Sequence, residues 1–336
     1  MKGKRVDITM IEAGLNRFLA DDRNLVLGFA KEPDGVSHRI FKKELSRFSL
    51  LNPYFGINGA FFLRRIFSKG QRLLLFLRPC EIRASVELIK LTQIEREGII
   101  AVSVDCFGAL SSKDSSNGFP DDHQGIADAL RSSEKVRTAC KTCKERRGVV
   151  GNGGIRFGRD GTLWAVSYDD KGDEFCDLFP GDHEELPAVM LVGEGTKAEP
   201  FSSDMTEFSK DFSKCIMCMN CRDMCPVCYC IDCVFNGSDY LPRGDALLNK
   251  IFRGGTTSLP SGKELFHLIR MFHVSQTCVG CGACEEACPQ GIPLTRYFKG
   301  ISERLQGMFS YTSGRSVEEP IPYLTFLEDE LNDAAD

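Results

Sequence analysis

The chain has 336 residues, of which 42% are hydrophobic and 26% charged, and its formal net charge is −5 at pH 7. This length allows about two domains with separate cores, and the negative charge argues against nucleic acid as the main partner. No apolar run is long enough to span a bilayer and no signal-peptide core follows the N-terminus, so we expect a cytoplasmic protein. Its sixteen cysteines are therefore expected to be thiols or metal ligands, not disulfides.

The first 70 residues contain few informative patterns. Apolar spacing predicts a helix over 8–20 and another over 58–67, with a short strand at 25–30 between them. The glycines here are scattered, which is typical of turns and does not match a nucleotide-binding motif.

Residues 71–108 predict a strand–helix–strand unit. The two buried strands are 73–77 and 99–104, and a helix over 81–97 lies between them. Such strands should be parallel and joined by a right-handed crossover. Cys80 and Cys106 follow the two strands directly, at the sheet edge where open α/β folds bind ligands. The N-terminus of the helix should favour the thiolate of Cys80.

A predicted polar loop at 109–135 leads to a C-x2-C pair, Cys140 and Cys143, among basic residues. With the two cysteines at the strand ends, this pair makes four potential ligands. Four ligands are enough for one iron–sulfur cluster, which would be the third after the two described below. Two alternatives remain open from spacing alone: a zinc site, or buried cysteines beside a solvated pair. A β-hairpin is predicted at 154–168 and a last strand at 189–192, and 193–203 reads as a linker.

Two cysteine runs of identical spacing dominate the second half of the chain. The first extends from Cys215 to Pro226 and the second from Cys278 to Pro289. Both are C-x2-C-x2-C-x3-C-P, the run of bacterial ferredoxins. Structural zinc sites prefer paired C-x2-C knuckles, so two complete runs closed by proline favour iron–sulfur clusters, which soft thiolates bind well.

In two-cluster ferredoxins the fourth cysteine of each run binds the other cluster. The ligands expected for cluster 1 are Cys215, Cys218, Cys221 and Cys288. The ligands expected for cluster 2 are Cys278, Cys281, Cys284 and Cys225. Four cysteines are left without a role, namely Cys176, Cys228, Cys230 and Cys233. We expect them to be inert or to pack near a cluster.

The fold class that these patterns predict is an α/β N-terminal domain with a parallel βαβ core, followed by a bacterial-type two-cluster ferredoxin domain (α+β). The α/β domain covers 1–200 and the ferredoxin domain 201–312, with a helical insertion at 239–275. His267 and His273 lie on an expected amphipathic helix in this insertion, and a structural role is expected for both. An acidic tail over 313–336 is either solvated or a docking segment for a basic partner.

The cysteine runs, together with RPCEIRASVELIKLTQ from Arg78 and VSVDCFG from Val102, resemble the beta subunits of the coenzyme F420 hydrogenase/dehydrogenase family, and formate dehydrogenase beta subunits most. The resemblance covers roughly 71–310 and favours the third [4Fe-4S] cluster, with Cys80, Cys106, Cys140 and Cys143 as its ligands. Family members usually begin with a longer segment that contains a Ser-Gly-Gly-type turn of the flavin site. No such turn occurs in the 79 residues before Cys80, so FAD is not expected here.

The resemblance implies an iron–sulfur electron-transfer subunit of an anaerobic oxidoreductase, not catalytic by itself. No nucleophile–base pattern or phosphate loop in the sequence points to bond-making chemistry. The implied partners are a redox catalytic subunit and an electron-acceptor subunit, in a formate dehydrogenase, hydrogenase or heterodisulfide-reductase-like complex. The alternative is a flavin-containing subunit that exchanges hydride with coenzyme F420 or NAD(P)H and passes electrons to the clusters.

Overall fold

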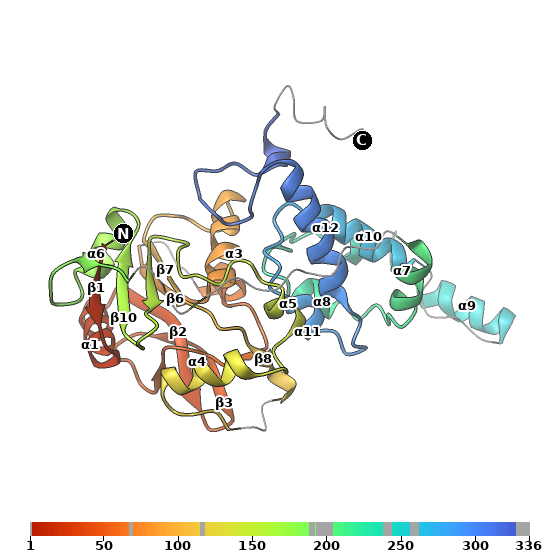
Figure 1. Ribbon diagram of the computed structural model, residues 1–336. Coiled ribbons are helices and arrows are strands. Elements are labelled where there is room, and N and C mark those ends of the chain that lie inside the picture. The colour runs from red at the N-terminus through yellow and green to blue at the C-terminus, as the bar shows by residue number, and fades with distance from the viewer. Residues whose placement is uncertain are drawn as a thin grey trace.

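The computed structural model describes residues 2–66, 70–114, 118–187, 192, 204–237, 244–255 and 262–326. Figure 1 shows a sheet with helices in the N-terminal part and a smaller helical region beside it that carries both cysteine runs. The expected α/β part is thus confirmed in outline as a mixed sheet with helices. The predicted linker at 193–203 and most of the predicted strand at 189–192 lie outside the described residues.

Among the described residues, one mixed sheet of nine strands organises the N-terminal part, in the order β11-β1-β10-β9-β7-β6-β2-β3, with β4 paired to β2. The pairs β2–β6, β6–β7 and β7–β9 are parallel and the others are antiparallel. The strands are β1 (Lys2–Val6), β2 (Asn24–Glu32), β3 (Gly35–Phe41), β4 (Phe48–Ser49), β6 (Arg72–Leu77), β7 (Ile99–Val104), β9 (Gly153–Phe157), β10 (Leu163–Ser167) and β11 (Glu184–Glu185). A separate short parallel pair joins β5 (Tyr54–Phe55) and β8 (Leu110–Ser111).

The central strand β6 is buried on both faces, as its continuous apolar run predicts. Successive side chains of a strand point to opposite faces, and β6 accordingly divides its residues between two cores. Leu73 and Leu75 pack with Ile82 of α3 (Pro79–Lys90), whereas Leu74 and Phe76 belong to the core on the other face. Helices on both faces therefore hold the carboxyl ends of β6 and β7 in place.

The N-terminal part contains a helix that the sequence analysis missed. Residues 109–135 are not a continuous loop, because α4 (His123–Ser132) lies within them. Asp122 caps this helix by accepting a hydrogen bond from the Gly125 N–H at 2.7 Å, and Ile126 and Leu130 are buried one turn apart. The other helices here are α1 (Ile8–Phe18), α2 (Leu63–Ile66), α3, α5 (Thr138–Lys141) and α6 (Asp170–Cys176).

Helix α3 is shorter than the predicted 81–97. It begins at Pro79, a residue suited to the first helical turn, and ends at Lys90. Thr92, just beyond it, has a φ of 56°, a left-handed conformation that a β-branched residue rarely adopts and that stops the helix.

The helical region contains the amphipathic helix that was expected in the insertion, which is α10 (Lys263–Val274). Its helices are α7 (Met205–Phe212), α8 (Asn220–Asp223), α9 (Gly244–Gly254), α10 (Lys263–Val274), α11 (Ala283–Glu286) and α12 (Leu294–Met308). Short 3₁₀ turns occupy Gly59–Phe62, Ser112–Asp114, Val234–Asn236 and Pro322–Leu324. The expected insertion holds α9, which extends away from the rest of the molecule in Figure 1, and α10, which packs in the core. Its segments 239–243 and 256–261 lie outside the described residues.

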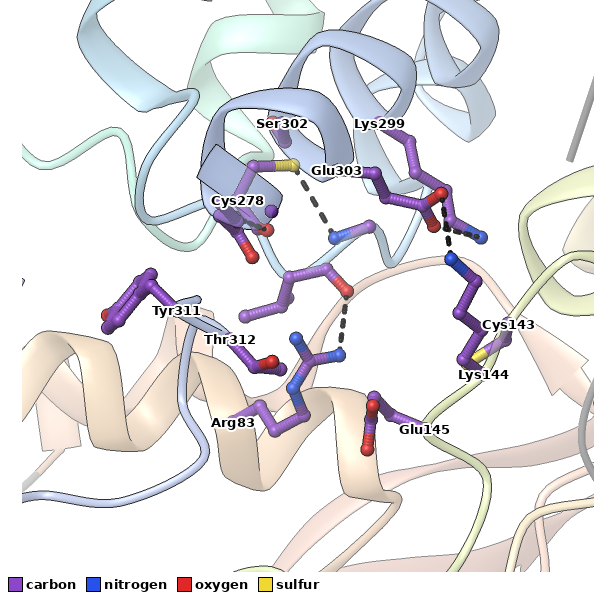
Figure 2. A pocket seen from close by; sticks show the side chains of 14 residues that line it. Arg83, Cys143, Lys144, Glu145, Cys278, Lys299, Ser302, Glu303, Tyr311 and Thr312 are labelled. Carbon is purple, nitrogen blue, oxygen red and sulfur yellow. Dashed lines mark hydrogen bonds and ion pairs between the residues drawn. The ribbon is translucent and has the colours of Figure 1, made fainter. Parts of the chain in front are cut away.

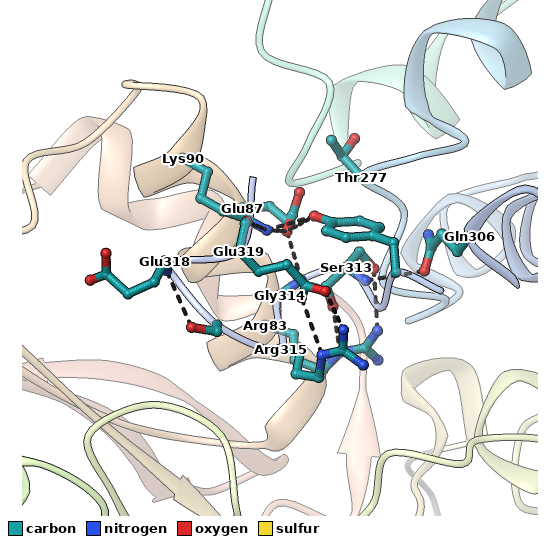
Figure 3. A network of polar contacts seen from close by, with 12 residues as sticks. Arg83, Glu87, Lys90, Thr277, Gln306, Ser313, Gly314, Arg315, Glu318 and Glu319 are labelled. Atoms are coloured by element: carbon teal, nitrogen blue, oxygen red, sulfur yellow. Dashed lines mark hydrogen bonds and ion pairs between the residues drawn. The ribbon is translucent and has the colours of Figure 1, made fainter. Parts of the chain in front are cut away.

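A buried polar network fixes the chain after α12 against α3 (Figure 3). Arg83 donates to the Ser313 carbonyl at 2.8 Å, and Glu87 accepts hydrogen bonds from the Tyr311 hydroxyl at 2.7 Å and the Gly314 N–H at 2.6 Å. Ser313 and, further along, Ile321 are fully buried. The first part of the predicted acidic tail is therefore packed on α3, and 327–336 lie outside the described residues.

Candidate metal centres

Four cysteines from separate parts of the N-terminal region line one cavity, and we call them the third cysteine group: Cys80, Cys106, Cys140 and Cys143. Cys80 lies in the first turn of α3 directly after β6, Cys106 follows β7, Cys140 lies in α5, and Cys143 follows α5. The parallel register of β6 and β7 brings the first two to the same sheet edge. Cys281 of the second run lines the same cavity.

A buried carboxylate holds the segment that carries Cys106. Asp105 is fully buried and accepts hydrogen bonds from the Gly148 N–H at 2.7 Å, the Arg156 Nε at 2.8 Å and the Phe157 N–H at 2.9 Å. Cys106 itself donates its N–H to the Arg146 carbonyl at 2.8 Å. Strand β9 and the 146–148 segment are thereby tied to the end of β7.

A second buried carboxylate, Glu81, orients the N-terminus of α3 beside Cys80. It accepts hydrogen bonds from the Arg78 N–H at 3.0 Å and the Gly59 N–H at 2.9 Å, and it contacts His38 Nε2 at 2.6 Å. Burial by itself would raise the pKa of Glu81, but His38 and Arg78 lower it overall to about 2. Glu81 is therefore a carboxylate at neutral pH, fully paired inside the protein.

Burial, not the helix N-terminus, dominates the thiol chemistry of this group. It raises the pKa of Cys80 well above the ordinary value and that of Cys106 to about 12. Our expectation that α3 favours the thiolate of Cys80 is therefore wrong for the metal-free protein, because desolvation penalises the charged form more strongly. A metal that binds here has to displace the thiol protons.

The first cysteine group consists of Cys215, Cys218, Cys221 and Cys288, which line one cavity. Cys288 comes from the second run, as the crossed ligand assignment predicts for cluster 1. The Met217 N–H points at the Cys215 sulfur at 3.4 Å. Cys218 is exposed, whereas the other three are buried.

Two side chains of α10, neither of which the sequence analysis placed beside a cysteine run, contact this group. His267 Nε2 lies 3.4 Å from the Cys215 sulfur, and Arg270 Nη1 donates to the Cys221 sulfur at 2.9 Å. Both residues are 1% exposed. Burial first, and then the charge of Arg270, lower the pKa of His267 to about 3, so this imidazole is neutral at physiological pH.

A signal for these two residues was present in the sequence. His267 and Arg270 are three positions apart on an amphipathic helix and share its apolar face with Phe266, Met271 and Val274. Polar side chains at buried positions need polar partners, and thiols of the neighbouring cysteine run are partners within reach. Our expectation of a structural role for His267 did not include its contact with the Cys215 sulfur. His273 is exposed.

The second cysteine group is Cys225, Cys278, Cys281 and Cys284. Cys225 of the first run and Cys284 of the second pack against the same hydrophobic core. The Gly280 N–H points at the Cys278 sulfur at 3.4 Å, the counterpart of the Met217 contact in the first group. The structure thus places residues of both runs next to one another, and the full ligand set of cluster 2 stays a prediction.

The three cysteine groups are adjacent to one another in a fixed order. Cys288 of the second run lines the cavity of the first group, and Cys281 of the second group lines the cavity of the third beside Cys80. Figure 2 shows a polar cavity where the second and third groups meet, with Cys278 and Cys143 in its wall. Lys299, also in this wall, donates to the Thr142 hydroxyl at 2.7 Å and joins α12 to the segment between Cys140 and Cys143.

The four cysteines without an expected role divide into two kinds. Cys176 is fully buried in the apolar core behind the sheet, and burial raises its pKa to about 12. Cys228 interacts with Cys230 and Cys233 beside the first run. Of these three, Cys230 is exposed. None of the four lines the cavities of the first and third groups.

The donor chemistry of the three groups suits iron–sulfur clusters. Each group offers four soft sulfur donors, and in two of them a backbone N–H is aimed at a sulfur. His267 Nδ1 and Arg270 Nε are buried without a hydrogen-bond partner beside the first group. In the part of the chain that the structure describes, no three Cys, His, Asp or Glu side chains close around a single metal ion.

Comparison with known sequences identifies the cysteine-run region. A family described as 4Fe-4S dicluster domain matches residues 211–292. The matched residues contain both cysteine runs. The ferredoxin half of the predicted architecture is therefore confirmed at this level. No helix among the described residues is long and apolar enough to cross a membrane.

Curated relatives match a wider part of the chain. The F420-dependent formate dehydrogenase subunit beta of Methanocaldococcus jannaschii is 32% identical over 124 residues, 37% of this chain and 29% of the relative. Subunit beta of F420-dependent formate dehydrogenase 1 of Methanococcus maripaludis is 25% identical over 304 residues, 73% of each protein. The predicted resemblance to these beta subunits is confirmed, although the chain spans less than a third of the first relative.

A solved structure of the F420-reducing [NiFe] hydrogenase complex from Methanosarcina barkeri also aligns. Its TM-score is 0.35 with 13% sequence identity, and the alignment covers 52% of this chain and 76% of that chain.

Proposed function

We propose that this chain is an iron–sulfur electron-transfer subunit of a larger oxidoreductase, with no substrate of its own. The contiguous order of the three cysteine groups carries the proposal: Cys281 of the second group lines the cavity of the third group, and Cys288 of the second run lines the cavity of the first. Bound [4Fe-4S] clusters supply one-electron chemistry. The dicluster domain and the formate dehydrogenase relatives support this assignment.

The protein's own contribution is to bury the sulfur donors, orient them and limit access of water. Cys80, Cys225 and Cys284 are so buried that their thiol pKa values are raised well above the ordinary value. Cys218 is the exposed member of the twelve proposed ligands. The edge of the first group is therefore the place where we propose that electrons enter or leave the chain.

The finer ligand sets and the domain division are part of this proposal. We assign the first, second and third cysteine groups to clusters 1, 2 and 3, respectively. The unit β6-α3-β7 is proposed as the parallel βαβ core that positions Cys80 and Cys106, within an α/β domain over 1–200. The ferredoxin domain is proposed to cover 201–312, with its helical insertion, followed by the segment 313–336.

The names of the relatives suggest which kind of complex contains this chain. Both are beta subunits of F420-dependent formate dehydrogenases, so we propose a formate dehydrogenase, hydrogenase or heterodisulfide-reductase-like complex as the assembly. Its catalytic subunit and an acceptor subunit would be the direct partners. The alternative, in which this chain itself binds a flavin and exchanges hydride with F420 or NAD(P)H, is distinguished by cofactor analysis.

Anoxic preparation of the full chain tests the proposal. We expect about twelve iron atoms and as many acid-labile sulfides per chain, four for each of three clusters, and a visible band that dithionite bleaches. Stoichiometric FAD would favour the alternative function. Bound zinc without a bleachable band would refute both electron-transfer functions.

Single cysteine variants test the ligand sets. C106S is expected to lower the iron content by about four atoms, because the third cluster loses a ligand. C230S is the matched control, since this cysteine is exposed and lies outside the three groups. Full iron in C106S would remove the third group from the proposal and leave the dicluster part intact.

A further inference from the structure

Arg270 occupies an unusual position for a cation. Its side chain comes from α10 and is 1% exposed. Nη1 donates to the Cys221 sulfur and Nη2 to the Cys221 carbonyl, each at 2.9 Å. The planar guanidinium thus holds both the backbone and the sulfur of one proposed ligand, in the two-pronged geometry that lysine cannot reproduce.

Aromatic rings hold the rest of the side chain in place. The guanidinium carbon lies 4.7 Å from the centre of the Phe298 ring and 5.5 Å from that of Phe266. These contacts come from α12 and from α10 itself. The cation therefore has a fixed position inside the protein and is not free to reach solvent.

Cysteines are the groups that raise the pKa of Arg270. Burial would lower the pKa of Arg270, but Cys221, Cys225, Cys284 and Cys228 raise it overall. Cys221 belongs to the first group, and Cys225 and Cys284 belong to the second. Arginine stays charged in proteins, and a buried charge without a counter-charge is strongly unfavourable. Negative sulfur ligands of the two groups would provide that counter-charge.

We propose that Arg270 raises the reduction potentials of clusters 1 and 2 by holding one fixed positive charge against Cys221, four residues before the cluster 2 ligand Cys225. The inference rests on the proposed function. Reduction adds one negative charge to a cluster, and a nearby cation stabilises that charge, most strongly where burial lowers the local dielectric. The direct bond to Cys221 makes the effect larger for cluster 1. Arg270 is thus a positioning and tuning residue, and it contacts the ligands without being one.

The test is an EPR-monitored redox titration of the anoxic full-length chain, with iron content measured in parallel. R270M removes the charge and keeps an unbranched apolar side chain of similar reach. We expect its midpoint potentials for clusters 1 and 2 to fall. For cluster 1 the equilibrium constant for one-electron reduction should decrease at least tenfold, a shift of about 59 mV. The C218S variant identifies which signal belongs to cluster 1.

R296M is the matched control, because it removes the same charge from the same region. Arg296 lies on α12 and pairs with Glu207 at 2.6 Å, so its charge already has a carboxylate partner. R296M is expected to leave both potentials at the wild-type values. An R270M protein with full iron and wild-type potentials would overturn the inference, as would equal shifts in R270M and R296M.

R270K decides the question if R270M does not hold its iron. Lysine keeps the positive charge and loses the two-pronged contact with Cys221, so both potentials should stay within about 59 mV of the wild-type values. A larger fall of both potentials in R270K would contradict the inference, because the charge is still present. A wild-type protein without bleachable clusters refutes the proposed function itself, which is a separate outcome.

Discussion

Met219 and Gly282 occupy the same position in the two cysteine runs and share a left-handed backbone, with φ of 62° and 72°. The preceding pair, Met217 and Gly280, matches in the same way at 55° and 67°. A left-handed φ costs free energy in residues with a Cβ, so the conformation is less favourable for the two methionines than for the two glycines. The two runs therefore have equivalent backbone turns although their sequences differ.

The neighbours of Gly282 explain why the second run uses glycine. A Cβ at this position would lie 2.6 Å from the Cβ of Ala139 and 2.8 Å from Nη2 of Arg137. Ala139 belongs to α5, the helix that carries Cys140. The missing side chain at Gly282 thus allows the loop of the second cysteine group to approach the third group closely.

G282A is expected to destabilise the protein by about 2–4 kcal/mol, because it adds left-handed strain and a clash with α5. Denaturant unfolding of the metal-free chain gives the free energy of unfolding, and iron analysis shows whether the iron of the proposed third cluster is lost first. M219A is the control, since it keeps a Cβ at the equivalent position. Equal stability of G282A and wild type would show that the close approach to α5 is not required.

Glu81 is expected to be essential for holding the N-terminus of α3 in place. E81Q removes the charge that pairs with His38 and Arg78, and breaking such a buried pair costs about 3 kcal/mol. The exposed Glu95 provides the control variant E95Q, for which thermal unfolding should match wild type. If E81Q retains the same unfolding free energy as E95Q, the network around Cys80 does not hold this turn in place.

The network between α3 and the chain after α12 makes a separate prediction. R83M removes the donors to Ser313 and to the Val279 carbonyl, 2.8 and 3.3 Å away, and leaves buried acceptors unpaired. We expect a loss of about 2–4 kcal/mol and faster amide hydrogen exchange over 311–321. R315M changes an exposed arginine paired with Glu319 and should shift stability by no more than about 0.5 kcal/mol. Unchanged exchange in R83M would argue against this docking role.

Cys176 distinguishes a core cysteine from a ligand. Its side chain is buried with Phe175 and Phe179 behind the sheet, so C176A is expected to cost about 1 kcal/mol and to leave the iron content unchanged. Loss of iron in C176A, at wild-type levels of folded protein by circular dichroism, would place this cysteine in a metal site.

Much of the architecture follows from local patterns. The apolar run at 73–77 has the length of a strand buried on both faces, and its position before Cys80 predicts where that cysteine lies. The cysteine runs likewise predict which residues should meet, because their spacing restricts how a turn can wrap around a cluster. Both kinds of prediction depend on residues that are close together in the sequence.

What could not be predicted depends on contacts between distant segments. The role of Arg270 depends on the packing of α10 against the first cysteine group. Helical periodicity predicts which face of a helix is buried, but it does not predict which residues contact that face. Helix α4 was missed because its capping residue, Asp122, stands in a polar stretch typical of a loop. The packing of Ser313 on α3 could not be predicted, because an acidic, polar segment is typical of solvent-exposed chain.

The central claim is that this chain moves single electrons through bound clusters. The most direct test is a reductive titration of the anoxic, full-length protein, with EPR and iron analysis on the same sample. We predict about three one-electron equivalents per chain, one for each [4Fe-4S] cluster, with about twelve iron atoms and no flavin signal. A chain that binds zinc and takes up no electrons would contradict the account.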